Sequence, residues 1–299
     1  MESDRTASTV KLPDGRTLGY AEYGAADGAA LLLFHGLPGS RLAVEELWPA
    51  DGPGPVRIIA PDRPGMGLSD FQPGRRFADW AADVAALADA LHLARFAVAG
   101  FSGGGPHALA VAHALPGRVT VAGCVCGSGQ FDDPESSAGL NRTNRFMTFL
   151  ARRAPVLLKP VARANARAVA KDPRRTFDRS AKDPLMSPAD RRDLADQRLR
   201  RLFIAHATEP FRPGPAGVAH EIRMCFTRWD FDPAEIRVPV HLWHGEADSY
   251  VPVAMARRIA QRIPEAELTV YPDEGHMCPV RHWDEIRDTL LGHSCRLCR

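Results

Sequence analysis

A serine flanked by glycines stands where an apolar segment of this chain gives way to a helical pattern. Residues 96–101 are short and apolar enough for a buried strand, and residues 106–115 have the pattern of a helix. The bend between them reads Gly100-x-Ser102-x-Gly104. Glycines suit a turn so tight that β-carbons would collide, and such a turn leaves its serine exposed above a sheet edge at a helix N-terminus. Because the spacing differs from that of phosphate-binding loops, the turn predicts a nucleophilic serine.

Segments that suit strands alternate with helical patterns along most of the chain. Residues 9–12 and 17–23 alternate apolar and polar side chains around Pro13-Asp14-Gly15, which predicts an antiparallel hairpin. Further strands are predicted at 30–34, 56–60, 96–101, 119–126, 239–243 and 267–271, and helices at 41–48, 77–93, 106–115, 253–263 and 282–291. This order predicts the α/β class, with a mostly parallel eight-stranded sheet flanked by helices.

One long segment breaks the alternation. Residues 130–228 contain no strand pattern, are rich in arginine and are punctuated by prolines. Helical runs are predicted at 142–150, 156–169 and 189–206. Roughly 100 residues is too long for a single crossover connection, so we expect a helical cap over the carboxyl edge of the sheet. The predicted organisation is a core of residues 1–129 and 229–299 with a cap of residues 130–228.

The balance of charge narrows the class of partner. Lys and Arg number 38 against 36 Asp and Glu, for a net charge of +2, which argues against general nucleic-acid or membrane-surface binding. Residues 1–6 lack the apolar core of a secretory signal, and no apolar run approaches the roughly 20 residues that span a bilayer. We expect a cytoplasmic protein with a small-molecule substrate, no nucleic acid and no membrane partner, and we leave a homodimer open.

Neither the cysteines nor the histidines follow a metal-binding pattern. Six cysteines in 299 residues do not make a disulfide framework, and Cys124 and Cys126 fall on a predicted strand as small core residues. Cys295-x-x-Cys298 stands alone near the end of the chain and is interpreted as part of a frayed tail. We therefore expect no metal and no cofactor.

A serine nucleophile needs a base, and the base needs an orienting acid. His276 comes just after the last predicted strand and is the candidate base. Asp248 comes just after the preceding strand and is the candidate acid. Open α/β sheets place their sites at the carboxyl ends of the strands, so these side chains are expected to meet Ser102. The rivals of Asp248 are Glu246, Asp132 and Asp133.

The oxyanion of an acyl-transfer reaction needs backbone N–H donors. One expected donor is Gly103, directly after the serine. The other should come from the loop His35-Gly36-Leu37-Pro38, where proline has no N–H and Leu37 is the natural donor. His35 is expected to hold this loop by a hydrogen bond rather than to act as the base.

The chain order Ser102, Asp248, His276 and several motifs together resemble the α/β-hydrolase fold superfamily, in its cap-bearing serine branch. The resemblance spans roughly residues 10–292 and rests on His35-Gly36-x-Pro38-Gly39-Ser40, Asp62-Arg63-Pro64-Gly65-Met66-Gly67-Leu68-Ser69, Gly100-x-Ser102-x-Gly104, His244-Gly245-Glu246-x-Asp248-x-x-Val251-Pro252 and Glu274-Gly275-His276. Haloalkane dehalogenases and epoxide hydrolases of this fold carry aspartate at the position of Ser102, so the serine argues against those two activities. Proline iminopeptidases usually carry a second glycine at the position of Leu37, so the leucine makes a peptidase a less favoured reading.

The resemblance implies a cofactor-independent hydrolase of a carboxylic ester or similar acyl bond. Ser102 would attack, His276 would take its proton, and Asp248 would orient the histidine, with an acyl-enzyme intermediate. The same triad could instead open a lactone or cleave a carbon–carbon bond, and a non-catalytic ligand-binding or receptor-like protein is a third reading. Residues expected to line the substrate pocket are Leu37, Phe101, Phe146 and Phe149; Phe203, Phe211, Phe226 and Trp229 are further aromatic side chains available to it.

Overall fold

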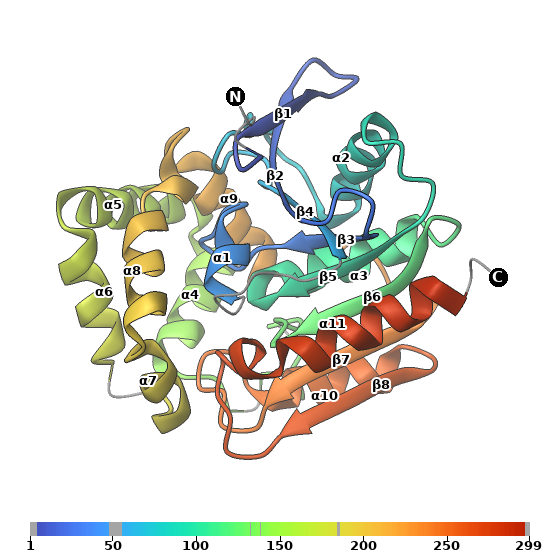
Figure 1. Ribbon diagram of the computed structural model, residues 1–299. Helices are drawn as coiled ribbons and strands as arrows, with labels where there is room; N and C mark the ends of the chain where they lie inside the picture. Colours follow the sequence, from blue (N-terminus) through green and yellow to red (C-terminus); the bar gives the residue numbers. More distant parts are fainter. Residues whose placement is uncertain (1–4, 48–55, 132, 138, 184–185, 297–299) are drawn as a thin grey trace.

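An eight-stranded sheet organises the computed structural model, which describes residues 5–47, 56–131, 133–137, 139–183 and 186–296 (Figure 1). The strand order is β1-β2-β4-β3-β5-β6-β7-β8. The strands are β1 (Ser8–Lys11), β2 (Thr17–Gly24), β3 (Ala29–Phe34), β4 (Val56–Pro61), β5 (Phe96–Phe101), β6 (Val119–Val125), β7 (Val240–Gly245) and β8 (Ala266–Tyr271). The pairs β1–β2 and β2–β4 are antiparallel and the other pairs are parallel, which confirms the predicted fold class.

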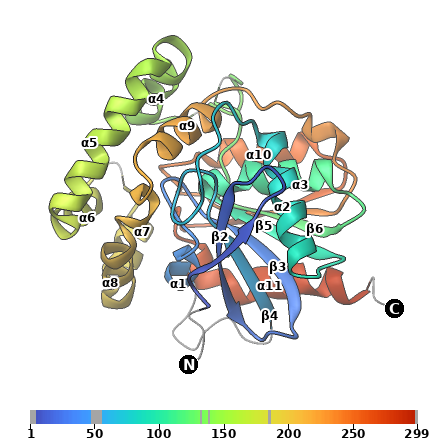
Figure 2. The same cartoon turned by 90° about the horizontal axis from the view of Figure 1, so that it is seen from above.

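The continuous apolar runs are explained by burial on both faces of the sheet. Along β3, Leu31 and Leu33 belong to the core cluster on one face, whereas Leu32 and Phe34 belong to the cluster on the other face. Helices α2 (Phe77–Ala90), α3 (Gly105–Ala114) and α10 (Val253–Arg262) cover one face, and α1 (Ala43–Leu47) and α11 (Pro279–Arg296) cover the other (Figures 1 and 2). Trp48, within the predicted helix 41–48, lies outside the described residues.

The segment between β6 and β7 is helical, as predicted, and we call α4–α9 the helical insertion. It comprises α4 (Arg142–Arg153), α5 (Leu158–Lys171), α6 (Pro173–Ala181), α7 (Pro188–Leu194), α8 (Gln197–His206) and α9 (Ala216–Cys225). These helices gather beyond the arrowheads of the parallel strands (Figure 1). The division of the chain into two domains stays a prediction.

The insertion departs from the predicted helices in two respects. The run 189–206 is two helices, because the Asp196 side chain accepts the Leu199 N–H at 2.9 Å and starts α8 anew. Helices α6 and α9 were not predicted at all. In addition, no helix within the described residues is both long enough and apolar enough to cross a lipid bilayer.

Candidate active site

The turn after β5 holds Ser102 in a conformation that few side chains adopt. Its φ is +55°, in the left-handed region. The neighbouring glycines make that turn feasible, because a Cβ at Gly100 would collide with the Gly104 carbonyl and a Cβ at Gly104 with the Phe34 carbonyl. A short 3₁₀ turn, residues 102–104, leads directly into α3. The serine hydroxyl is therefore presented at the carboxyl edge of the sheet.

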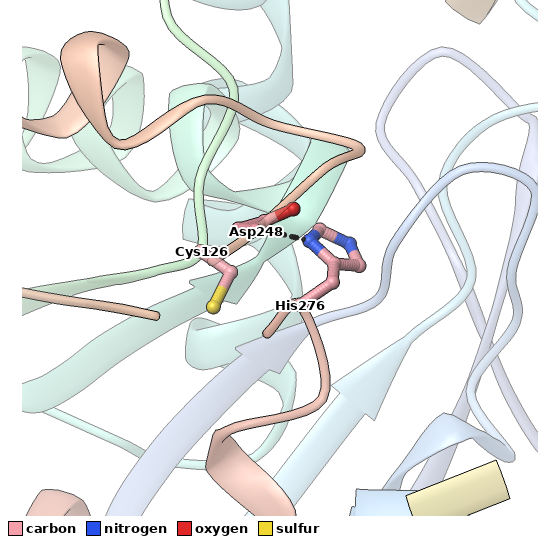
Figure 3. A group of neighbouring side chains, drawn as sticks. All are labelled: Cys126, Asp248 and His276. Carbon is pink, nitrogen blue, oxygen red and sulfur yellow. Dashed lines mark hydrogen bonds and ion pairs between the residues drawn. The ribbon is translucent and has the colours of Figure 1, made fainter. Parts of the chain in front are cut away.

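The structure brings together the three side chains predicted to form the triad. His276 Nε2 lies 3.0 Å from Ser102 Oγ, and His276 Nδ1 lies 2.7 Å from Asp248 Oδ2. Figure 3 shows the Asp248–His276 contact, made by two loops that follow β7 and β8. The other oxygen of Asp248, Oδ1, accepts the N–H groups of Tyr250 and Val251 at 2.9 and 2.8 Å. The carboxylate is thus fixed by its own loop and aims one oxygen at the histidine.

The electrostatics of this pair favour a charged aspartate beside the histidine. Burial alone would raise the pKa of Asp248, but the charge of His276 and hydrogen bonds from His244 and His276 hold that pKa well below its usual value. Burial likewise acts to lower the pKa of His276, and the negative charge of Asp248 outweighs it, so the pKa is raised. An imidazole in this setting is stabilised when it takes up a proton.

The rival acids have other partners. Glu246 is exposed and forms an ion pair with Arg257 at 3.4 Å. Asp133 forms an ion pair with Arg258 at 2.9 Å. Asp132 lies outside the described residues. Of the described candidates, only Asp248 contacts His276 as an orienting acid would.

The two expected oxyanion donors lie side by side. A Cβ built at Gly103 would be 2.9 Å from Leu37 Cβ and 3.5 Å from Leu37 N. Both residues line one cavity together with Ser102 and His276. Gly103 is in the first turn of a helical segment, where backbone N–H groups have no partner within the helix. The arrangement can present two amide dipoles to an oxygen bound beside Ser102.

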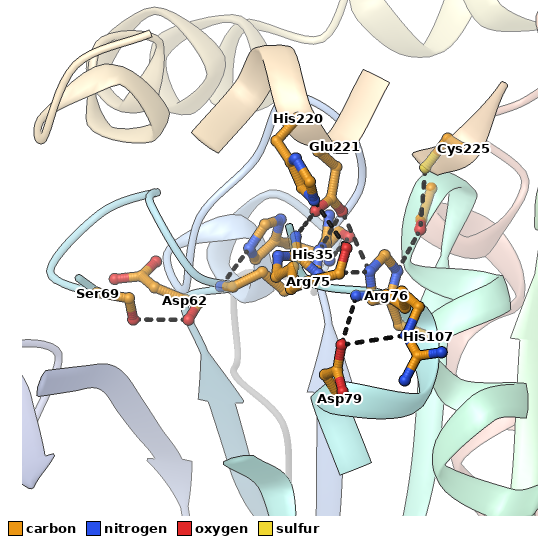
Figure 4. A network of polar contacts seen from close by, with 12 residues as sticks. His35, Asp62, Ser69, Arg75, Arg76, Asp79, His107, His220, Glu221 and Cys225 are labelled. Atoms are coloured by element: carbon orange, nitrogen blue, oxygen red, sulfur yellow. Dashed lines mark hydrogen bonds and ion pairs between the residues drawn. The ribbon is translucent and has the colours of Figure 1, made fainter. Parts of the chain in front are cut away.

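A network of buried charged and polar side chains, part of which is drawn in Figure 4, holds the Leu37 loop in place. Arg63 donates to the carbonyls of His35 and Gly36, at 2.5 and 3.0 Å, and its own N–H is hydrogen-bonded to His35 Nε2. Glu221 of α9 accepts hydrogen bonds from both Arg63 and Arg75. The side chains of these three charged residues are fully buried. His35 therefore holds the loop, as expected, and Glu221 ties the insertion to it.

Two cavities meet at the histidine. The first, of about 260 Å³, contains Ser102 and is lined by residues that include Leu37, Phe131 and Phe226. The second, of about 370 Å³, lies between the core and the insertion and is lined mostly by apolar side chains, although the polar residues Glu46 and His206 also line it. His276 and Tyr250 line both cavities. The two cavities are therefore neighbours, with these two side chains in the wall of each.

The residues predicted to line the substrate pocket differ in whether they line either of these cavities. Leu37 lines the serine cavity. Phe101 lies against His276, with ring centroids 5.0 Å apart, but is not among the residues that line either cavity. Phe146 and Phe149 were wrongly placed: they are 57% and 59% exposed, and neither lines either cavity. Of the other aromatic side chains, Phe226 lines the serine cavity, and Phe203 and Phe211 line the second one.

Sequence reasoning missed two residues that touch the catalytic loops. Asp190 of α7 accepts the Met277 N–H at 2.8 Å, directly after His276, and its charge acts to raise the pKa of that histidine. Asn144 of α4 donates to the Tyr250 carbonyl at 2.5 Å. Only contacts across the fold identify these residues. A polar residue at a helix start, the one local signal that both share, is also what an ordinary cap looks like.

One group of side chains has the composition of a metal site. Donor atoms of Cys126, Asp248 and His276 lie within 4.8 Å of one another (Figure 3). Tetrahedral zinc, with ligands at about 2.0–2.2 Å, would hold a nitrogen and an oxygen ligand roughly 3.3 Å apart. Since His276 Nδ1 and Asp248 Oδ2 are 2.7 Å apart, and burial raises the pKa of the Cys126 thiol, the group fits a hydrogen-bonded pair beside a neutral thiol.

Comparison with known sequences places this geometry in context. The sequence model of the alpha/beta hydrolase fold matches residues 29–280. A non-heme chloroperoxidase of Streptomyces lividans is 30% identical over 300 residues, which cover 95% of this chain and 98% of the relative. An uncharacterized hydrolase of Saccharomyces cerevisiae is 33% identical over 113 residues, 37% of this chain and 39% of its own length.

Comparison with solved structures agrees on the fold. The enol-lactonase of Burkholderia xenovorans LB400 superposes with a TM-score of 0.65, covering 96% of this chain and all of that chain. The sequence identity is 20%, so the likeness concerns the fold alone.

Proposed function

The chain belongs to the alpha/beta hydrolase fold family, and from that premise we propose that it is a serine hydrolase that cleaves carboxylic esters of small molecules. One observation carries the proposal: Ser102 Oγ, His276 and Asp248 form a continuous chain of contacts, at 3.0 and 2.7 Å, in a cavity that also contains Leu37 and Gly103.

The chemistry would run through an acyl-enzyme. His276 Nε2 takes the proton of Ser102 Oγ as the oxygen attacks the ester carbonyl, and Asp248 stabilises the imidazolium. The N–H groups of Leu37 and Gly103 stabilise the oxyanion, and the loss of one such donor typically costs about 100- to 1,000-fold in rate. The imidazolium then protonates the leaving alcohol. Water, deprotonated by His276, releases the acid and restores the serine.

The two cavities suggest which side of the ester is larger. The carbonyl must lie in the cavity of Ser102 and the oxyanion donors, whereas the leaving oxygen must face His276, which protonates it. The larger, mostly apolar cavity is the neighbouring one, which shares His276 and Tyr250 with the serine cavity. We therefore propose esters whose alcohol is bulkier and more apolar than their acid. A lactone or a carbon–carbon substrate would use the same triad, and no described residue of the site favours either over an open-chain ester.

Labelling with a fluorophosphonate tests the nucleophile. The wild-type protein should be labelled at Ser102, and Ser102→Ala should lose both the label and ester turnover. Ser128→Ala is the matched control, because Ser128 lines the same cavity but should keep the label. A wild-type protein that neither turns over esters nor takes the label would contradict the proposal and would favour a ligand-binding protein.

Two isomeric esters test the orientation. 2-Phenylethyl acetate and ethyl phenylacetate have the same atoms, with the aromatic ring on the alcohol in the first and on the acid in the second. The proposed use of the cavities predicts a higher kcat/KM for 2-phenylethyl acetate. The opposite preference would show that the larger cavity holds the acid, and would leave the nucleophile assignment untouched.

A further inference from the structure

Helices α4 and α5 and the turn that joins them, which we call the α4–α5 hairpin, carry apolar side chains that nothing in the described chain covers. Every large apolar side chain that is exposed in the described part of the chain lies between residues 146 and 161. They are Phe146, Phe149, Val156, Leu157 and Val161, at 57%, 59%, 77%, 47% and 39% exposure. Figure 2 shows α4 and α5 along the outer flank of the molecule, away from the sheet. We call this set the apolar cap face.

These side chains are not the core-facing side of the hairpin. Leu150, Ala151, Leu158 and Ala162 fill that side and pack with Val218 and Ala219 of α9. Phe146 and Phe149 are three residues apart and share a stripe of α4 with Arg142 and Arg153. The hairpin therefore has one set of apolar side chains packed against α9 and a second set open to solvent.

The charge around the apolar cap face is of one sign. Residues 136–171 contain no acidic side chain and eight basic ones, namely Arg142, Arg145, Arg152, Arg153, Lys159, Arg163, Arg167 and Lys171. All eight are exposed. None forms an ion pair within the described residues, whereas many arginines elsewhere do. The net charge of +2, which argued against membrane-surface binding, is a sum over the whole chain. Because residues 136–171 contribute eight positive charges to that sum, the rest of the chain is net negative.

We propose that the α4–α5 hairpin docks on anionic lipid headgroups, with the apolar cap face at the boundary between headgroups and acyl chains. Helices that lie in that boundary combine an apolar stripe with flanking Lys and Arg. A second copy of the chain fits less well, because a symmetric contact would bring the two sets of basic side chains together. Nucleic acid would use the charges but would leave the aliphatic side chains Val156, Leu157 and Val161 without a role. The proposal does not depend on the ester-cleaving activity.

Flotation with lipid vesicles tests the docking. The protein should bind vesicles of phosphatidylcholine mixed with phosphatidylglycerol, should bind vesicles of phosphatidylcholine alone far more weakly, and should be released by high salt. Arg152→Gln/Arg153→Gln should weaken the binding by roughly 30-fold, since each basic side chain near the surface contributes about fivefold. Phe146→Ser/Phe149→Ser should weaken it by about tenfold or more.

A matched pair of arginines on another helix provides the control. Arg174 and Arg175 on α6 are exposed adjacent arginines like Arg152 and Arg153, but Asp172 and Asp178 lie beside them in the sequence. Arg174→Gln/Arg175→Gln should leave vesicle binding unchanged. Unchanged thermal unfolding of each variant verifies its fold.

Three results would overturn the proposal. The first is the absence of binding to anionic vesicles, or equal binding to both kinds of vesicle. The second is equal weakening by the two arginine pairs. The third is a dimer, seen by light scattering, that Phe146→Ser/Phe149→Ser dissociates while wild-type protein ignores the vesicles. None of these results bears on whether fluorophosphonate labels Ser102.

Discussion

Helix α9 and the α4–α5 hairpin belong to the same insertion, yet their charged side chains differ in burial and in pairing. Helix α9 buries Glu221 completely, between Arg63 and Arg75 of the core. The hairpin exposes its basic side chains and leaves them without ion pairs among the described residues. Buried charges have one low-energy arrangement, because each needs its partners, whereas exposed charges tolerate many. The buried charges of α9 therefore fix its position against the core, whereas the hairpin presents apolar and basic side chains to solvent.

The way α9 approaches the core supports this contrast. A Cβ at Gly217 of α9 would collide with the carbonyl of Gly65, whose own φ is +82°. The two backbones thus touch where the loop after β4 bends, next to the arginine that holds the Leu37 loop. The insertion is therefore anchored to the arginine that holds the loop of the predicted oxyanion donor Leu37, so changes at this anchor should reach the catalytic site.

Removing the charge of Glu221 should have the largest effect. Glu221→Gln keeps the volume but leaves two arginines buried without a counter-charge, which should lower the free energy of unfolding by about 3–5 kcal/mol. The pKa of Glu221 is held well below its usual value: burial acts to raise it, and Arg63 and Arg75 outweigh burial. The measurement is urea unfolding at neutral pH.

The control for Glu221→Gln is an exposed glutamate. Glu235 pairs with His113 at 3.0 Å and is 65% exposed, so Glu235→Gln should cost less than about 1 kcal/mol. An equally small cost for Glu221→Gln would mean that the buried network does not anchor α9, and the contrast with the hairpin would fall.

The histidine that joins α8 to α1 is intermediate between the fully buried Glu221 and the exposed charges of the hairpin. His206 of α8 contacts Glu45 and Glu46 of α1 at 3.4 and 3.1 Å, with 12% of its side chain exposed. Burial acts to lower the pKa of His206, but the two carboxylates raise it from 6.5 to about 9. A raised pKa stabilises the folded state below the unfolded value, so this contribution is fully present below pH 6.5 and is lost as the pH rises through about 9.

The His206 contribution should reach at most about 3 kcal/mol. We expect the stability difference between wild type and His206→Gln to shrink from pH 6 to pH 9.5, as followed by urea unfolding at a series of pH values spanning roughly those limits. Taking the difference between the two proteins removes the contribution of other titrating groups. A difference that stays constant across this range would show that the contact between α8 and α1 carries no charge-dependent stability.

The sequence was sufficient for the features that depend on local patterns. The strands and helices of the core follow from alternating segments, and the tight turn at Ser102 follows from glycines that such a turn requires. The meeting of Ser102 with Asp248 and His276 follows because all three come directly after parallel strands, whose carboxyl ends share one edge.

The sequence was insufficient where orientation depends on tertiary packing. Helix α4 carries apolar residues on two stripes, and only contact with α9 decides that Leu150 is buried and Phe149 is exposed. The same limit applies to Asp190 and Glu221. Each carboxylate is unremarkable in the sequence and gains its role from partners 87 and 158 residues away.

Substitutions in the hairpin should have the smallest effect on stability, in contrast to the substitution of Glu221 in α9. Phe146→Ser/Phe149→Ser and Arg152→Gln/Arg153→Gln remove exposed side chains without ion pairs among the described residues, so each should change the free energy of unfolding by less than about 0.5 kcal/mol. Urea unfolding in the absence of lipid provides the measurement. A loss of 2 kcal/mol or more, roughly the cost of emptying a buried site, would mean that the apolar cap face is covered in solution by the protein itself. The hairpin would then be an anchor like α9 rather than a surface held ready for a partner.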